Sequence, residues 1–237
     1  MPTPRFEPKF ETALIVGAGA GLSASLARLL AKEGIKVALA SRSTGDLDGL
    51  VQEIGAKTFA CDASKPVDVA KLFADLEGSI GAPNIVIYNA SYRTRGPFAD
   101  LDPAEVEKSI AVSAYGGFLV AREAVRRMLP KQHGVILFTG ASASVKGYAQ
   151  SAPFAMGKFA LRGLSQSMAR ELQPQGIHVA HIVIDGGIKS ARRAEPADNP
   201  DSLLDPDAIA VNYLNLIYQP RSAWSAELEV RPWTEKF

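Results

Sequence analysis

Short apolar runs rich in β-branched residues alternate along the chain with longer stretches of helical pattern. Most of these runs are continuously apolar, which is typical of strands covered on both faces. Strands are predicted at Ala13–Val16, Lys36–Ala40, Thr58–Ala60, Ile85–Tyr88, Val135–Thr139, His178–Ile184 and Glu227–Val230. Such runs separated by helices indicate a parallel sheet wrapped by helices.

The helical stretches lie between these strands. Pro66, Pro103 and Pro206 stand at or just before three helix starts, where the missing N–H costs little. Helices are predicted at Leu22–Glu33, Asp46–Ile54, Val67–Glu77, Pro103–Met128, Ala152–Gln173 and Pro206–Tyr218. The elements predict an α/β fold in which one parallel seven-stranded sheet is flanked by helices on both faces. No repeat or linker divides the chain, so residues 1–237 are expected to form a single domain.

Two segments fall outside this pattern. Residues 1–10 contain three prolines and are expected to form a poorly ordered arm. Residues 189–204 combine Pro196, Asn199 and Pro200 with mixed charges after the sixth strand. Their position favours a mobile flap on the substrate side of a ligand cleft, and a surface loop without a role is the alternative.

The charge balance and the single cysteine restrict the possible partners and the compartment. The net charge is +1, from 26 basic and 25 acidic residues, which gives no electrostatic reason to expect a nucleic acid or a membrane as partner. Cys61 is the single cysteine and fits a reducing compartment, so a cytoplasmic protein is expected. His133, His178 and His181 show no metal-ligand spacing, and no metal site is predicted.

The first strand runs into a glycine-rich loop that is followed directly by a helix. Glycines let the backbone approach a pyrophosphate, and the helix N-terminus offers unpaired N–H groups at the positive end of its dipole. A dinucleotide site is therefore predicted, and a turn chosen for tight strand–helix packing is the alternative. The predicted contacts in this loop are Gly17, Gly19, Ala20, Gly21 and Leu22.

The end of the second strand distinguishes NADP from NAD. A carboxylate there would bind the ribose 2′-hydroxyl and repel a 2′-phosphate. This chain has Ser41 followed by Arg42, which supply a hydroxyl donor and a planar cationic fork. NADP(H) is therefore favoured over NAD(H), although Arg42 as an ordinary solvated charge is the alternative.

These segments resemble the short-chain dehydrogenase/reductase family. The glycine-rich loop is similar to its Thr-Gly-x-x-x-Gly-x-Gly motif, with Val16 and Ser23 in place of the first and last residues. Cys61-Asp62-Ala63 resembles the family's acidic contact to the adenine, and Tyr88-Asn89-Ala90-Ser91 resembles its Asn-Asn-Ala-Gly. The resemblance implies a doubly wound Rossmann-type fold. It adds as cofactor contacts Asp62, Ala63, Asn89, Ala90, Ser91, Gly186 and Ile188.

The resemblance also implies an altered active site. The family's Tyr-x-x-x-Lys is represented by Phe154 and Lys158, as in a divergent subgroup that has phenylalanine at the tyrosine position. The serine expected 13 residues earlier is Ala141, with Ser142 and Ser144 nearby but out of register, and the expected asparagine is Ser113. Lys158 is expected to keep the family's role of binding the nicotinamide ribose, and service as a new acid is the alternative.

Two residues are candidates to replace the missing proton donor. Asp185 follows the sixth strand, where ligands of open α/β sheets bind, and it is expected either to act as acid or base or to cap the following turn. Tyr148 is expected to line the substrate cleft, as a donor or as part of its wall. The candidate catalytic residues are thus Lys158, Asp185, Tyr148 and Ser142.

These features predict an NADP(H)-dependent oxidoreductase that acts on a small molecule without the tyrosine acid. An already electrophilic C=N bond or a conjugated C=C bond would suit such a site. A catalytically impaired cofactor-binding scaffold or regulatory subunit is the alternative. The segments Ala111–Ala124 and Ala152–Gly163 are rich in small residues, and the family pairs these helices between subunits, so a homodimer or homotetramer is expected.

Overall fold

The computed structural model describes residues 9–191 and 193–235. Its seven strands form one parallel sheet in the order β3-β2-β1-β4-β5-β6-β7. The strands are β1 Thr12–Val16, β2 Lys36–Ser41, β3 Lys57–Ala60, β4 Ile85–Tyr88, β5 Gly134–Thr139, β6 Ile177–Ile184 and β7 Glu227–Val230. All seven predicted strands are confirmed, each end lying within one residue of its predicted position.

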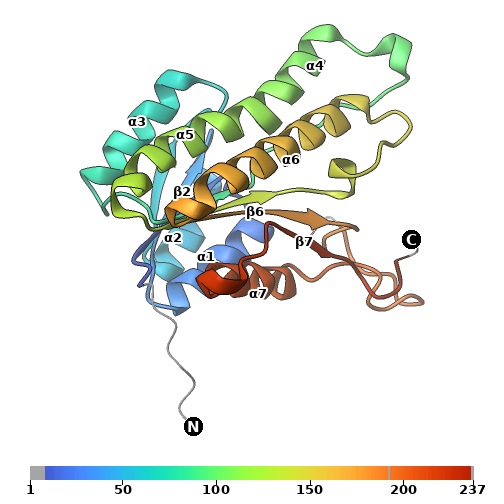
Figure 1. Cartoon of the computed structure of the whole chain (residues 1–237). Helices are drawn as coiled ribbons and strands as arrows, with labels where there is room; N and C mark the ends of the chain where they lie inside the picture. The colour runs from blue at the N-terminus through green and yellow to red at the C-terminus, as the bar shows by residue number, and fades with distance from the viewer. Residues whose placement is uncertain (1–8, 192, 236–237) are drawn as a thin grey trace.

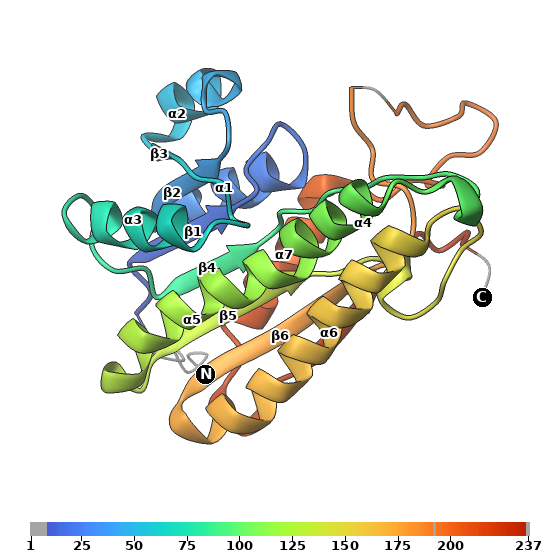
Figure 2. The same cartoon turned by 90° about the horizontal axis from the view of Figure 1, so that it is seen from above.

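Helices cover both faces of the sheet, as Figures 1 and 2 show. Helices α1, α2 and α7 lie on one face, and α3, α4, α5 and α6 lie on the other. Their bounds are α1 Leu22–Lys32, α2 Asp48–Ile54, α3 Pro66–Glu77, α4 Pro103–Ile110, α5 Gly116–Met128, α6 Ala152–Leu172 and α7 Pro206–Ile217. The predicted doubly wound α/β architecture is confirmed.

The position of each strand in the sheet explains its sequence. Every residue of β1, β4, β5 and β6 is buried, because these strands have a neighbour on each side and helices on each face. The edge strands β3 and β7 are partly exposed. Continuous apolar runs therefore mark the centre of the sheet, and mixed sequences mark its edges.

The order of the strands reverses at β1, whose two neighbours are β2 and β4. In open α/β sheets, ligands bind outside the carboxyl ends of the strands at such a point. Here the chain leaves β1 at Gly17 and leaves β4 at Asn89, and the two segments touch. The fold thus brings the glycine-rich loop and the segment after β4 to one edge of the sheet.

The predicted single helix over Pro103–Met128 is wrong in one respect. Residues Ala111–Tyr115 form a π-helical segment between α4 and α5. In this segment the hydroxyl of Tyr88, from β4, donates a hydrogen bond to the carbonyl oxygen of Val112. A widened turn leaves carbonyl groups without the usual helical partner, so the side chain from the sheet supplies a hydrogen bond there.

The two segments predicted to be irregular differ in how far the structure describes them. Residues 1–8 of the predicted arm lie outside the described residues, whereas Phe10 is buried and stacks on His133 with 4.8 Å between ring centroids. Arg192, within the predicted flap, also lies outside them. The mobility of residues 189–204 stays a prediction.

Across residues 9–191 and 193–235, no helix has the length and apolar character that crossing a membrane requires.

Candidate active site

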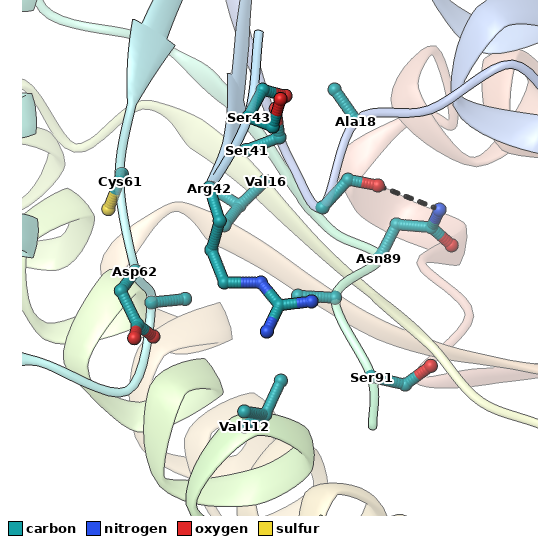
Figure 3. Close-up of a pocket in the computed structure, with 13 residues that line it drawn as sticks. Val16, Ala18, Ser41, Arg42, Ser43, Cys61, Asp62, Asn89, Ser91 and Val112 are labelled. Atoms are coloured by element: carbon teal, nitrogen blue, oxygen red, sulfur yellow. Dashed lines mark hydrogen bonds between the residues drawn. The ribbon is translucent and has the colours of Figure 1, made fainter. Parts of the chain in front are cut away.

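Three neighbouring cavities lie at the carboxyl ends of the strands, on the edge of the sheet where the strand order reverses between β1 and β4. The first has a volume of about 640 Å³ and is drawn in Figure 3. Its walls come from the segments that follow β1, β2, β3 and β4, together with Val112. They consist of Val16, Gly17, Ala18, Ser41, Arg42, Ser43, Cys61, Asp62, Ala63, Asn89, Ala90, Ser91 and Val112.

The glycine-rich loop is held in place by contacts with the segment after β4. Gly17 has φ of +86°, and a Cβ atom at this position would lie 2.3 Å from the backbone nitrogen of Ala90. The Ser23 hydroxyl donates to the Gly17 carbonyl at 3.0 Å, and the Asn89 side-chain amide donates to Ser23 Oγ at 2.7 Å. Ser23, which replaces a family glycine, therefore helps to fix the loop.

The space around the loop fits a bound pyrophosphate. A Cβ atom on Gly19 or Gly21 would meet nothing within 4 Å. Helix α1 begins after Gly21 with no side chain capping its first N–H groups and no acidic residue in its first turn. Such an end attracts an anion through its free N–H groups and its dipole.

Arg42, predicted as a cofactor contact, lines the first cavity. Its side chain extends into the cavity (Figure 3). Asp62 accepts hydrogen bonds from the backbone and hydroxyl of Ser64, which lower the pKa of this carboxyl, and Lys65 and Arg42 lower it further. The Ser41 hydroxyl donates to the carbonyl oxygen of Ser43, so it must rotate before it can bind a phosphate.

A second cavity of about 530 Å³ adjoins the first through Asn89 and Ser91. Lys158 lines it and is only 3% exposed, and its Nζ donates to the carbonyl oxygen of Thr139 at 2.6 Å. Burial lowers the pKa of Lys158 to about 8. The other lining residues are Gly21, Leu22, Thr139, Gly140, Ala141, Phe154, Ile184, Gly186, Ile188, Lys189, Ser190 and Arg193.

A third cavity of about 400 Å³ lies beyond Phe154, whose ring lines both the second and the third. The Phe154 ring centroid is 5.7 Å from Lys158 Nζ and 4.7 Å from the guanidinium carbon of Arg93. The third cavity is lined by Arg93, Arg95, Ala141, Ser142, Ala143, Tyr148, Ala149, Gln150, Ser151, Phe154, Ile184, Gly186, Gly187 and Arg193. An apolar ring thus stands where a phenol would face both cavities.

The residues that stand at the other altered family positions also lie at these cavities or beside them. Ala141 lines both the second and the third cavity, and its backbone nitrogen donates to Ser144 Oγ at 3.1 Å. Ser144 is fully buried, so its hydroxyl holds the turn. Ser113 is also buried, and its Oγ accepts a hydrogen bond from the backbone nitrogen of Tyr92 at 3.3 Å.

Most of the residues predicted to form the site lie in these cavities, and three do not. Ser142 and Tyr148 line the third cavity, and Tyr148 is 46% exposed. Gly19, Ala20 and Asp185 line none of the three.

The side chain of Asp185 is engaged in ion pairs away from the cavities. Asp185 is 3% exposed, and its carboxylate lies 3.5 Å from Lys146 Nζ and 3.3 Å from a guanidinium nitrogen of Arg231. Ile184 and Gly186, on either side of Asp185, line the second and third cavities. The carboxylate therefore belongs to an ion-pair network behind the cavity wall.

Three lining arginines were not predicted as site residues. Arg93 and Arg95 come from the segment after β4, and Arg193 comes from the segment after β6. Arg192, which precedes Arg193, lies outside the described residues. The signal in the sequence was the pair Arg93 and Arg95, which closely follows the Asn-Ala-Ser motif.

Among the described residues, no group of three His, Cys, Asp or Glu side chains is placed to hold a metal ion.

Comparisons with known proteins agree with this geometry. Residues 11–200 match the family model for short chain dehydrogenases. Short chain aldehyde dehydrogenase 1 of Euphorbia lathyris is 31% identical over 218 residues, which cover 87% of this chain and 73% of the plant protein.

Two solved structures are similar along nearly the whole chain. A short-chain dehydrogenase from Rhodopseudomonas palustris is 34% identical with a TM-score of 0.81, covering 95% of this chain and 100% of that one. A metagenomic short-chain oxidoreductase in complex with NADP is 27% identical with a TM-score of 0.82, covering 94% and 97%.

Proposed function

This chain belongs to the short-chain dehydrogenase family of oxidoreductases, and we propose that it is an NADP(H)-dependent member that works without a tyrosine acid. The observation that carries the proposal is the position of Phe154, in the wall between the Lys158 cavity and the third cavity. In this proposal, Phe154 stands at the position of the family's usual proton donor and has no proton to give. We also propose that the chain belongs to a divergent subgroup of the family in which phenylalanine replaces the catalytic tyrosine.

We propose that the first and second cavities hold NADP(H). When bound, the reduced cofactor supplies a hydride to the substrate. Arg42 supports the choice of NADP(H), because it extends into the first cavity and carries the charge and the planar fork that bind a 2′-phosphate. The metagenomic relative that was solved in complex with NADP gives further support.

Lys158, which lines the second cavity, is proposed to bind the nicotinamide ribose. Its ammonium group is buried and already donates one hydrogen bond, to the Thr139 carbonyl, so two of its three protons remain for a ligand. Gly21, Leu22, Gly186 and Ile188 are proposed to line the same part of the cofactor site, because all of them line this cavity.

The substrate is proposed to be a small molecule that lies in the third cavity, against Phe154. Tyr148 is the candidate donor that lines this cavity with a phenol, and Ser142 lines it with a hydroxyl. Lys146 Nζ lies 5.9 Å from the Tyr148 ring centroid. Asp185 is the weaker candidate, because its ion pairs lie behind the wall of the cavity.

The substrate test is NADPH oxidation by the purified protein with a cyclic imine, a conjugated enone and a simple ketone of similar size. Loss of a general acid typically costs about 10²–10⁴ in rate, so ketone reduction is expected to be slow. A protonated imine accepts the hydride without a further proton, and a reduced enone takes its proton on carbon from a group other than residue 154. Turnover of the imine or the enone is therefore expected to be at least about 10²-fold faster. Ketone turnover at an equal or higher rate would contradict the proposal.

A homo-oligomer remains our proposal for the assembly. Phe118 on α5 and Met156 and Phe159 on α6 are large apolar side chains that are 43%, 50% and 44% exposed. They lie in the two helical regions that were predicted to pair between subunits.

A reducing compartment, as in the cytoplasm, is proposed for the location of the protein. The single thiol, that of Cys61, supports this proposal, and it is buried.

A further inference from the structure

Among the described residues, the charged side chains that line the third cavity are all positive. They are Arg93, Arg95 and Arg193. The second cavity adds Lys158 and Lys189, and no acidic residue in the described part of the chain lines it. A cofactor pyrophosphate accounts for positive charge in the second cavity, but the third cavity lies beyond Phe154 and needs a separate explanation.

These three arginines differ from several other arginines of the chain in their lack of salt bridges to described residues. Arg28, Arg127 and Arg162 each have a glutamate within 2.7 Å. By contrast, none of the three cavity arginines forms a salt bridge with any residue that the structure describes.

The cavity arginines also repel one another. Burial lowers the pKa of Arg93, and the charges of Arg95 and Arg193 lower it further. An anion between these side chains would relieve this repulsion. All three are exposed, so a ligand can reach them.

Arg93 is held at the boundary between the two cavities. Its guanidinium carbon lies 4.7 Å from the Phe154 ring centroid, and guanidinium groups stack favourably on aromatic faces. The Phe154 ring thus holds the Arg93 guanidinium in place. This positive charge lies beside the place where the substrate would meet the cofactor. The rest of the wall combines the apolar side chains of Ala141, Ala143 and Ile184 with polar ones. The polar side chains are Ser142, Tyr148, Gln150 and Ser151.

We infer that the third cavity is an oxyanion subsite in which Arg93 and Arg95 bind a carboxylate or phosphate group of a small substrate. Guanidinium groups bind both oxyanions through two parallel hydrogen bonds. Arg193 borders both cavities and contributes charge to the subsite from the cofactor side. The assignment of this anion as substrate rests on the proposed function.

The test is calorimetric titration of the purified protein, free and saturated with NADPH, with benzoate, phenyl phosphate and benzamide. Benzamide has the shape of benzoate without its charge. Hydrogen bonds to charged groups contribute about 1.5–3 kcal/mol, so the better of the two anions is expected to bind at least about tenfold more tightly than benzamide. Whichever anion binds better identifies the carboxylate or the phosphate as the group recognised.

Variants assign the effect to the subsite. Arg93→Gln and Arg95→Gln are each expected to weaken anion binding about tenfold or more and to leave NADPH binding unchanged. Arg93→Lys keeps the charge but loses the fork, so an intermediate loss is expected. Arg170→Gln, near the opposite end of α6 from Phe154, is the matched control and is expected to bind the anions as the wild type does.

Two results would overturn the inference. One is equal affinity for the anions and benzamide, or anion binding that neither Gln substitution changes. The other is an Arg93→Gln variant that loses NADPH affinity and keeps benzoate affinity, because this would place Arg93 in the cofactor site. If NADPH fails to bind while arginine-dependent anion binding persists, the proposed function fails and the subsite stands.

Discussion

Replacing Phe154 with tyrosine is expected to create ketone reductase activity. The new hydroxyl would extend from a ring whose centroid lies 5.7 Å from Lys158 Nζ, and this cation favours release of the phenolic proton. A general acid typically contributes about 10²–10⁴ in rate. We expect the lower end, about 10²-fold in kcat/KM, because Ala141 and Ser113 leave the other two family roles without their usual side chains.

The measurement is NADPH oxidation with a simple ketone by Phe154→Tyr and wild type, together with NADPH affinity. Affinity is expected to be unchanged, because a half-buried ring at the edge of two cavities gains only one hydroxyl. The double variant Ala141→Ser, Phe154→Tyr should gain further activity, since it restores a second donor. Unchanged ketone turnover in both variants, with NADPH still bound, would show that Phe154 is not the position of the missing acid.

Gly17→Ala is expected to damage both the fold and cofactor binding. Positive φ costs a residue with a Cβ atom about 1–2 kcal/mol, and overpacking typically costs about 1–3 kcal/mol. Both apply here, because φ is +86° and the Cβ atom would lie 2.3 Å from the Ala90 nitrogen. A fall in Tm of about 5–15 °C is expected, measured by thermal unfolding, with loss of NADPH affinity.

Gly19→Ala is the matched control, because it separates the fold from the cofactor site. Its φ is not positive, and its Cβ atom would meet nothing within 4 Å, so Tm is expected to stay unchanged or rise slightly. NADPH affinity is expected to fall about tenfold or more, because the methyl group occupies space that the backbone leaves for the pyrophosphate. Full NADPH affinity in Gly19→Ala would contradict the placement of the pyrophosphate at this loop.

The sheet could be predicted closely from the sequence, because burial on both faces makes the central strands continuous apolar runs. The π-helical segment within Pro103–Met128 could not. It is accompanied by a hydrogen bond from Tyr88 to Val112, and Tyr88 stands on a strand 24 residues earlier. Local helical pattern carries no information on such a partner.

The residues that line the first two cavities were easier to predict than those that line the third. Most of the former follow directly from strand ends, which parallel strands bring to one edge. The arginine cluster depends instead on the meeting of the segment after β4, helix α6 and the segment after β6. Asp185 was placed correctly at the end of β6, but side chains alternate along an extended chain, and Ile184 and Gly186 are the neighbours that line the cavities.

Titration of the purified protein with NADPH and NADH, followed by nicotinamide fluorescence, tests the proposed NADP(H) site. Repeating the titration at several pH values tests the role of Lys158. Burial lowers the pKa of this residue to about 8. The ammonium is protonated below this pH and loses its proton as pH rises through it. NADPH affinity is therefore expected to weaken above pH 8, by at most about tenfold per pH unit.

At pH 7 we expect micromolar binding of NADPH and weaker binding of NADH. Hydrogen bonds to charged groups contribute about 1.5–3 kcal/mol, so Arg42→Ala should remove at least about tenfold of the NADPH affinity and leave NADH unaffected. Equal affinity for the two cofactors in wild type and variant would contradict the role of Arg42. No binding of either cofactor would contradict the oxidoreductase proposal and leave a scaffold that keeps the fold and has lost its chemistry.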